Sequence, residues 1–235
     1  MVTSTVENYI KHVYLLSQGL AEGGLVPMGE MAQALDVTPG TATVMIKTLS
    51  EAGLVDYEPR MGTRLTVRGE RLALHVLRRH RLVELFLVQT LGMDWSEIHE
   101  EAEQLEHVIS DRLLERIDRY LGEPTLDPHG DPIPSARGEV SARRLLPLSE
   151  ARPGLSFVIG RIADQGEVFL QFAEQNGLVP GRTIRLALRN EAAGIVVIER
   201  EDGTCLSVGL PAAAKIEIEA KPEPCVRPGR SATTS

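Results

Sequence analysis

The chain has 235 residues, 43% hydrophobic and 25% charged, which is enough for one large domain or two small ones with real cores. No run of about 18 apolar residues occurs, and no basic flank leads into an apolar segment near the start, so we expect a soluble protein without a membrane partner. A formal net charge of −8 would ordinarily argue against nucleic acid as a partner.

The first part of the chain carries a helix-turn-helix pattern. Apolar side chains at helical spacing predict a helix over 2–18, and a short helix over 28–35 follows. Thr38 and Pro39 then match an N-cap followed by proline at the first helical position, and the helix that they open runs to Ala52. Two short helices joined by so brief a turn are typical of a helix-turn-helix.

A predicted hairpin turns this unit into a winged helix. Two β-like runs, 54–57 and 64–67, flank a turn with Gly62 at its tip. The exposed start of the third helix and the hairpin offer hydroxyl, backbone and basic groups suited to base edges and phosphates. The candidate DNA contacts are Thr38, Pro39, Gly40, Thr41, Thr43, Lys47, Arg60 and Arg64. Each threonine by itself is also explained as a cap or surface residue, but as a set they favour DNA.

Two further predicted helices carry histidines and carboxylates at one-turn spacing. His80 and Glu84 lie on a long helix predicted over 68–91. A capping box at Asp94 and Glu97 starts an acid-rich helix. One stripe of that helix holds His99, Glu103, Glu106 and His107. Like charges at this spacing destabilise an isolated helix by a few tenths of a kcal/mol per pair, and a divalent cation would remove the conflict. Facing His/Glu pairs are a typical way to build a metal site between helices; a solvated acidic face is the alternative.

Charge and apolar surface of this middle segment point to its partners. Residues 76–120 hold six basic and ten acidic groups, so they contribute −4, half of the net charge, which bound cations would largely neutralise. A protease of the H-E-x-x-H type is excluded, because Glu103 stands where that motif requires histidine. The helices carry more apolar surface than a small winged domain needs, and we therefore predict a two-fold homodimer, which matches the palindromy of DNA half-sites.

The C-terminal half changes character. Four prolines in 122–134 predict a boundary, in which His129 is either a ligand or, as we expect, a turn residue. Residues 135–149 are expected to form a mobile linker. Five short runs of period two in 150–220 predict a small β-barrel, with one helix over 167–176.

With these elements in place, the chain resembles the diphtheria toxin repressor family of metal-dependent transcriptional regulators, which has iron-responsive and manganese-responsive branches. The resemblance is carried by Glu7-Asn8-Tyr9, by Arg79-His80-Arg81-Leu82-Val83-Glu84, and by residues 99–111 and 128–134. It covers nearly everything through Pro134, and the β-rich end resembles the family's SH3-like domain. It implies a cytoplasmic homodimer that binds operator DNA when its metal sites fill.

The resemblance also implies the domain organisation. The expected parts are a winged helix-turn-helix DNA-binding domain (1–73), a helical metal-binding and dimerisation domain (74–134), a linker (135–149), an SH3-like β domain (150–220) and a disordered tail (221–235). The expected fold class is therefore a mainly α N-terminal half followed by a small all-β SH3-like barrel.

The resemblance assigns two metal sites. One would contain His80, Glu84 and His99; the other would contain Glu103, Glu106 and His107, with Asn8 reaching across from the first helix. Gln165 or Asp164 is implied as a ligand from the β domain, with a surface turn as the alternative. Iron-responsive members carry Cys at position 103; the oxygen and nitrogen ligands present here are harder and favour Mn(II) over Fe(II) or another divalent transition metal. The branches usually carry Met or Asp at position 8, and Lys11 stands where some manganese-responsive members have an acidic ligand.

The predicted function is a DNA-binding repressor that responds to Mn(II) and controls metal-ion homeostasis. In the empty protein, repulsion among the carboxylates would loosen the first helix from the acidic helices; metal joining Asn8 to Glu103, Glu106 and His107 would fix that relation and the spacing of the recognition helices. The alternatives are an iron(II)-responsive regulator of the same kind, a metal store without DNA, and a His/Glu metalloenzyme, which lacks a recognisable nucleophile or separate general base.

Overall fold

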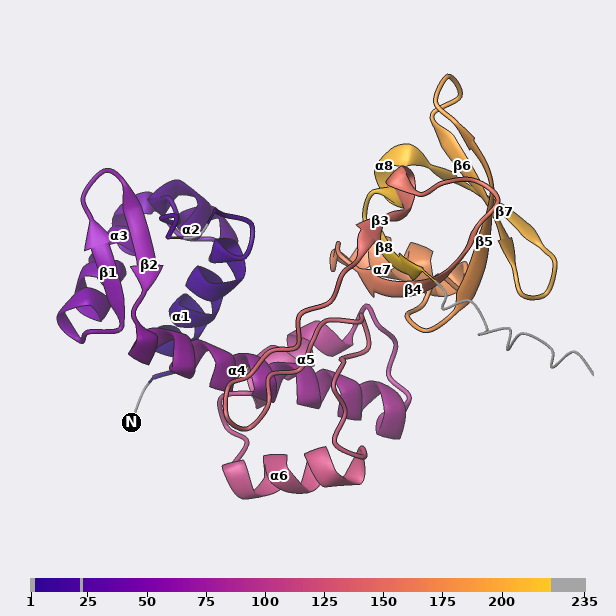
Figure 1. Ribbon diagram of the computed structural model, residues 1–235. Helices are drawn as coiled ribbons and strands as arrows, with labels where there is room; N and C mark the ends of the chain where they lie inside the picture. Colours follow the sequence, from indigo (N-terminus) through magenta and orange to yellow (C-terminus); the bar gives the residue numbers. More distant parts are fainter. Residues whose placement is uncertain (1–2, 22, 221–235) are drawn as a thin grey trace, which may run out of the picture. The chain divides into compact units, whose positions relative to one another are not determined.

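The computed structural model describes residues 3–21 and 23–220, which divide into two compact units, 1–142 and 143–235. Figure 1 shows the first unit as helices with a small hairpin, and the second as a curved sheet with short helices. The tail 221–235, predicted to be disordered, lies outside the described residues. None of the described helices has the length and apolar character needed to cross a bilayer.

The predicted winged helix-turn-helix is confirmed. Its elements are α1 (Ser4–Ser17), α2 (Met28–Ala34), α3 (Pro39–Glu51), β1 (Val55–Glu58) and β2 (Gly62–Leu65). The sequence signal at the start of α3 works as predicted: the Thr38 side chain accepts a hydrogen bond from Thr41 N at 3.1 Å, and Pro39 is the first helical residue. Apolar side chains from all three helices form one core around Ile10, Met31 and Ile46, which are completely buried.

The hairpin differs from the prediction at its glycine. Gly62 is the first residue of β2 rather than the tip of the turn. Its φ is 146°, and an added Cβ would lie 2.5 Å from the carbonyl oxygen of Val26. Thr63 forms an isolated antiparallel bridge with Val26, so the segment before α2 lies directly against the wing. Gly62 is therefore required for close packing, and the turn itself places Arg60 at a φ of 68°.

The long predicted helix is two elements. After the Thr66 cap, α4 (Val67–Phe86) runs for 20 residues, and a π-helical turn, η1 (Leu87–Leu91), continues it to Gly92. Gly92 has a φ of 68°, the left-handed conformation that ends helices. At the other end, a Cβ on Gly69 would lie 1.9 Å from the Leu54 carbonyl oxygen, so α4 begins in direct contact with the residue that precedes β1.

The acid-rich helix is shorter than predicted. It is α5 (Ile98–Leu105), and Glu97 at its N-cap makes no side-chain capping bond. The expected capping box is replaced by a backbone turn, in which Glu97 N donates to Asp94 O at 3.0 Å. Glu106 is the C-cap residue, so Glu106 and His107 lie in the turn that follows the helix. Next, Ser110 caps α6 (Asp111–Tyr120).

The proline-rich stretch 122–134 is a packed part of the first unit, and the domain boundary expected there stays a prediction. It folds back on itself through Asp127 N to Asp131 O and Ile133 N to Thr125 O, both at 2.9 Å. Ile133 packs in one cluster with Leu82, Leu85 and Leu114 of α4 and α6. The first compact unit continues to Ala142. The finer division into domains 1–73 and 74–134 stays a prediction.

The second unit is a small antiparallel sheet, in line with the predicted SH3-like fold. Its elements are β3 (Leu146–Pro147), η2 (Leu148–Glu150), β4 (Ser156–Ile162), α7 (Glu167–Gln175), β5 (Thr183–Asn190), β6 (Ile195–Arg200), β7 (Cys205–Gly209), α8 (Leu210–Ala213) and β8 (Ile216–Ala220). The strand order is β3-β8-β4-β5-β6-β7, with a register shift between Ile159 and Arg161. Because β3 and β7 are edge strands, the sheet is not a closed barrel across the described residues of this unit. Residues 146–149, expected in the linker, belong to β3 and η2.

Candidate metal centre

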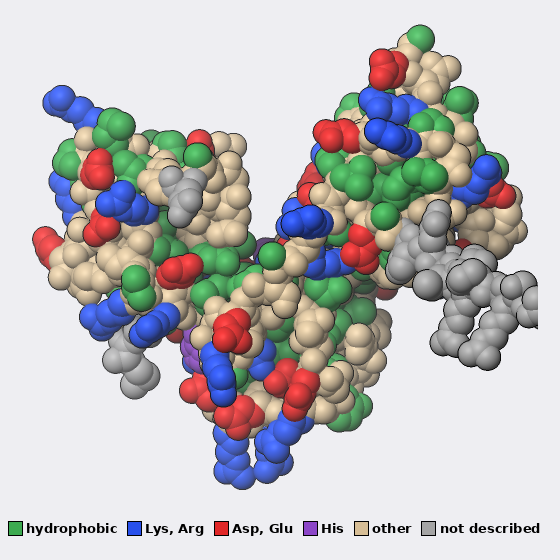
Figure 2. Space-filling model, viewed as in Figure 1, with side chains coloured by type: hydrophobic (Ala, Val, Ile, Leu, Met, Phe, Trp, Pro, Cys, Tyr) green, Lys and Arg blue, Asp and Glu red, His purple; other side chains and the backbone are tan. Residues whose placement is uncertain are grey.

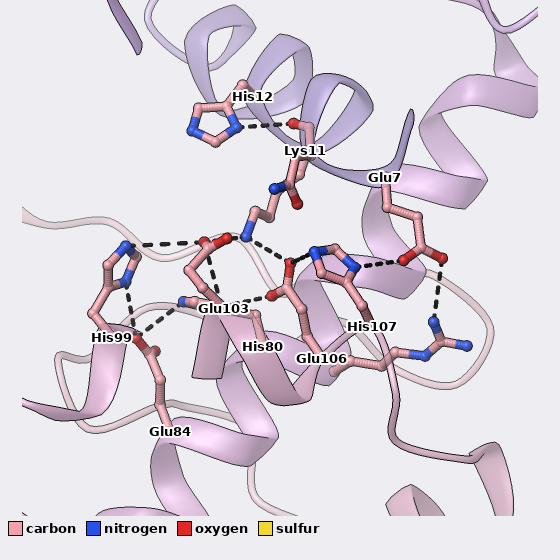
Figure 3. Close-up of polar contacts among 11 residues, drawn as sticks. Glu7, Lys11, His12, His80, Glu84, His99, Glu103, Glu106 and His107 are labelled. Carbon is pink, nitrogen blue, oxygen red and sulfur yellow. Dashed lines mark hydrogen bonds and ion pairs between the residues drawn. The ribbon is translucent and has the colours of Figure 1, made fainter. Parts of the chain in front are cut away.

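His80 and Glu84 lie one turn apart on the buried side of α4, as their spacing predicts. His80 Nε2 is 3.0 Å from Glu84 Oε1, and the two residues are 6% and 1% exposed. His99, at the start of α5, brings its Nδ1 to 3.5 Å from the same Glu84 oxygen. The structure therefore brings together the three residues of the first predicted set, with two imidazoles beside one buried carboxylate (Figure 3).

A third side of this site comes from the 122–134 stretch. Ligand atoms of Glu84, Asp127 and His129 all lie within 4.8 Å of one another, and all three residues are buried. Asp127 shapes the loop, because its Oδ1 accepts hydrogen bonds at 2.9 Å from the backbone N–H groups of His129 and Asp131. Sequence reasoning missed Asp127 and expected His129 to be a turn residue. The available signal was the alternation of Asp, His and Asp at 127, 129 and 131 within a Pro/Gly-rich loop.

Several polar atoms of this third side have no hydrogen-bond partner within the described residues. They are both ring nitrogens of His129 and Oδ2 of Asp127, and they are buried. Asp127 Oδ2 does have an ion pair, with Arg81 Nε at 3.4 Å, but the His129 ring has only an edge-on contact with Trp95, with 5.1 Å between ring centroids. Buried polar groups are nearly always paired, so the His129 nitrogens call for an explanation. A divalent cation among Glu84, Asp127 and His129 would supply a partner for the imidazole, and the donor set fits such an ion.

The electrostatics of this central cluster, defined as His80, Glu84, His99, Asp127 and His129, are set by burial and by one close charge pair. Burial works to lower the pKa of His80, but nearby carboxylates, Glu84 foremost, outweigh it and raise the pKa to about 9. Burial works to raise the pKa of Glu84, yet His80 holds it below its ordinary value. Burial raises the pKa of Asp127 and lowers that of His129. Both groups are thus driven toward their neutral forms, a cost that a bound cation would remove for the carboxyl group.

The second predicted set is also brought together, but around a lysine. Ligand atoms of Glu103, Glu106 and His107 lie within 4.8 Å of one another. The Lys11 ammonium, from α1, pairs with Glu103 and lies 2.8 Å from Glu106 Oε1. We define these four residues as the lysine cluster; Figure 3 shows the Lys11 side chain directed between the two carboxylates. With that ammonium present, the set does not fit a divalent cation in the way that the central cluster does.

The remaining groups around the lysine cluster are engaged as well. His107 Nδ1 lies 2.7 Å from Glu7 Oε2, and Arg79 lies 3.4 Å from the other Glu7 oxygen. His80 Nδ1 is 2.6 Å from Glu106 Oε2, so His80 joins the two clusters. Asn8 differs, because its buried Oδ1 has no hydrogen-bond partner in the described part of the chain. Sequence reasoning used Glu7 only as a family motif and did not foresee its contact with His107.

The candidate DNA contacts are gathered at the start of α3 and on the wing. The Thr38, Thr41 and Thr43 hydroxyls bond within the helix start: Thr38 Oγ1 is 2.9 Å from Thr41 Oγ1, and Thr43 Oγ1 donates to Pro39 O at 2.7 Å. Lys47 on α3 and Arg60 on the turn are exposed. Arg64 is exposed too, but it pairs with Asp56 at 3.2 Å.

Two candidate ligands, Gln165 and Asp164, lie in the second unit. Gln165 lies in the turn before α7, in the second unit, and its role as a ligand stays a prediction. Asp164, the other candidate, is held by Lys215 Nζ at 2.5 Å and accepts from Gly166 N at 2.9 Å. On the face shown in Figure 2, acidic and basic side chains are interspersed over the first unit.

Comparison with known families accounts for most of the chain. Residues 1–63 match the family described as iron dependent repressor, N-terminal DNA binding domain. Residues 66–135 match the iron dependent repressor, metal binding and dimerisation domain, and residues 146–220 match the FeoA domain. The chain is 27% identical over 229 residues to the iron-dependent repressor IdeR of Mycobacterium leprae (strain TN), covering 92% of this chain and 98% of that protein.

Solved structures of transcriptional repressors are also similar to this chain over most of its length. One described as a manganese-dependent transcriptional repressor in complex with manganese is 38% identical, with a TM-score of 0.83, and covers 92% of this chain and 100% of that one. The structure of ScaR with bound Cd2+ is 34% identical, with a TM-score of 0.73, covering 92% of this chain and 99% of that one. These relatives are transcriptional repressors rather than enzymes. With its winged helix-turn-helix and its matches to the DNA binding domain, to the metal binding and dimerisation domain and to the FeoA domain, the chain belongs to the iron-dependent repressor, or diphtheria toxin repressor, family of metal-dependent transcriptional regulators.

Proposed function

We propose that this protein is a manganese-responsive repressor whose metal centre is the central cluster. Glu84, Asp127 and His129 would hold the ion, with His80 and His99 beside it. The observation that carries the assignment is the buried His129 ring, whose two nitrogens have no hydrogen-bond partner in the described residues. His129 stands in a group with Glu84 and Asp127 whose ligand atoms lie within 4.8 Å of one another. The positive charge of the bound ion would compensate the buried carboxylates. The ion would also give the Asp127 and His129 side chains a partner.

The ligand chemistry favours manganese. The central cluster offers imidazole nitrogen and carboxylate oxygen without a thiolate, which suits Mn(II) and, as the next choice, Fe(II). A similar structure is described as a complex with manganese, whereas ScaR is described with cadmium. The two cysteines of the sequence, Cys205 and Cys225, both come after residues 66–135, which match the metal binding and dimerisation domain. The proposed physiological ion is therefore manganese, and the proposed role is metal-ion homeostasis in the cytoplasm.

We propose that the protein acts on operator DNA as a homodimer. Residues 66–135 match a dimerisation domain, and exposed apolar side chains of this region offer a surface for a second copy: Leu91, Val108, Leu113 and Tyr120. The start of α3 would face the major groove, with Lys47, Arg60 and Arg64 near phosphates. Because α4 follows the wing directly, an ion that fixes α5 and 122–134 against α4 restricts the part of the chain that carries the recognition helix.

The proposal is tested with DNA selected from a random duplex pool by the manganese-loaded protein. A labelled duplex from that pool is titrated with the protein at controlled free Mn(II), Fe(II) or Zn(II). We expect affinity to rise by about 5–150-fold on metal addition, the range common for allosteric coupling. Glu84→Gln should remove that gain, and Glu101→Gln, an exposed change on α5, should keep it. Equal affinity with and without every metal would reject the proposal.

A further inference from the structure

The lysine cluster contains a cation that the chain itself supplies, the Lys11 ammonium. Lys11 is 2% exposed and Glu106 is 0% exposed, so the ammonium and at least one carboxylate are removed from water together. Lysine is almost never fully buried unless it is paired, and here it has two carboxylate partners, Glu103 and Glu106. The pairing joins α1 to α5 and its following turn, positions that are more than 90 residues apart in the chain.

The contrast with the central cluster shows what this ammonium does. In the central cluster, neither ring nitrogen of His129 has a hydrogen-bond partner in the described residues, and Asp127 Oδ2 has one ion pair, to Arg81 Nε at 3.4 Å. In the lysine cluster, both carboxylates contact the ammonium, and His107 Nδ1 lies 2.7 Å from Glu7. His107 Nε2 and the nearby Asn8 Oδ1 have no hydrogen-bond partner in the described part of the chain. The carboxylates of the lysine cluster thus share a cation that the chain itself supplies.

We infer that the Lys11 ammonium takes the place of a second metal ion in this protein. It neutralises Glu103 and Glu106 and fastens α1 to the metal-binding helices whether or not metal is present. This inference rests on the proposed metal centre and restricts it: metal control belongs to the central cluster alone. It also corrects the expectation that α1 is loose in the empty protein, because the carboxylates expected to repel one another share a buried ammonium (Figure 3).

The direct test is the number of manganese ions bound per full-length chain, measured by equilibrium dialysis after metal removal with EDTA. Lys11→Glu should bind one more ion than the wild type, because it replaces the ammonium with a carboxylate. Adding His107→Gln to Lys11→Glu should remove the extra ion, whereas His107→Gln alone should leave the wild-type number unchanged. Arg71→Glu makes the same charge change on an exposed part of α4 and should bind the wild-type number.

Two results of the dialysis would overturn the inference: an ion in the wild type that His107→Gln removes, or no additional ion in folded Lys11→Glu. If Lys11→Glu does not fold, as judged by circular dichroism, Lys11→Gln is used in its place; it removes the ammonium and leaves the same three ligands for the added ion. Should the wild type bind no manganese at all, the proposed function fails, while the gain in the variant still decides the role of Lys11.

A second measurement needs no metal. In EDTA, Lys11→Met should lower the melting temperature more than Arg71→Met, a change at an exposed position of α4, since it leaves two carboxylates without their ammonium. Combined with Glu106→Gln, the loss should be smaller than the sum of the two single losses, as expected for groups in direct contact. Additive losses would show that the pair does not hold α1 in place, and would contradict the inference.

Discussion

His129 is a buried imidazole whose two nitrogens have no hydrogen-bond partner in the described residues, and this makes a specific prediction. An unsatisfied buried polar group costs about 1–3 kcal/mol. His129→Phe keeps a ring edge-on to Trp95 and removes the polar atoms. In EDTA, we therefore expect the variant to be more stable than the wild type by about 1 kcal/mol in urea denaturation, and to lose the stabilisation that manganese gives the wild type.

The matched control is His75→Phe. His75 lies on α4 with its side chain 42% exposed, and its partner is Asp111 at 3.4 Å, outside the central cluster. This control should keep the stabilisation by manganese. If His129→Phe were less stable than the wild type in EDTA and responded to manganese as before, the imidazole would be a structural group and not a ligand.

The raised pKa of His80 predicts how the metal-free protein responds to pH. Its pKa rises from an ordinary 6.5 to about 9 in the folded state, because Glu84 and other carboxylates outweigh burial. The stability that this group contributes is fully present below about pH 6.5 and is lost as pH rises through about 9. The loss is on the order of 3 kcal/mol, at about 1.4 kcal/mol per pKa unit. Urea denaturation in EDTA at pH 6 and pH 10 measures it.

His80→Gln separates this effect from other titrating groups. The variant should show a smaller fall in unfolding free energy between pH 6 and pH 10 than the wild type. Parallel falls for the two proteins would mean that His80 carries no additional proton in the folded state.

At the residue scale, the sequence predicted which candidate side chains lie together. His80 and Glu84 meet because i and i+4 positions share one face of any helix, and Glu103, Glu106 and His107 meet because they follow one another closely in the sequence. Their roles as metal ligands stay predictions. Asp127 was missed because its approach to Glu84 depends on how 122–134 folds back, which no local spacing encodes. The motif around Lys11 was recognised, but the ammonium's position between two carboxylates required the packing of α1 against α5.

At the element scale, Gly69 at the start of α4 is expected to be the glycine of the first unit whose substitution lowers stability most. A Cβ at Gly69 would lie 1.9 Å from the Leu54 carbonyl oxygen, a backbone atom that cannot move alone. Gly69→Ala should cost about 1–3 kcal/mol or more through overpacking. Gly29→Ala in α2 is the control, since nothing lies within 4 Å of its added Cβ, and it should be neutral or slightly stabilising. Thermal unfolding measures both variants. Equal melting temperatures for the two would contradict this packing.

Local chemistry predicted some element boundaries and not others. Thr38 and Pro39 begin α3 as expected, because a cap and a first-turn proline act within four residues. The capping box at Asp94 and Glu97 did not form, and a backbone turn replaced it. The strand β3 was missed because two residues, one a proline, carry no periodicity. Its pairing with β8 is a tertiary contact.

At the scale of the whole molecule, helix α4 connects the proposed metal centre to the proposed DNA-binding surface. The helix begins with the Thr66 cap one residue after the wing, and it carries His80 and Glu84. The order of the elements, and the family resemblance itself, were available from the sequence. The sequence did not show that the sheet of the β unit is open. The periodicity of single strands does not determine whether the two edge strands pair with each other.

The measurement that tests the central claim most directly is the affinity of the protein for manganese with and without saturating operator DNA. Coupling between two sites is reciprocal, so DNA must tighten manganese binding by the same factor by which manganese tightens DNA binding. We predict a gain of about 5–150-fold in manganese affinity for the wild type, and none for Glu84→Gln. An unchanged manganese affinity in the presence of bound operator would contradict the account.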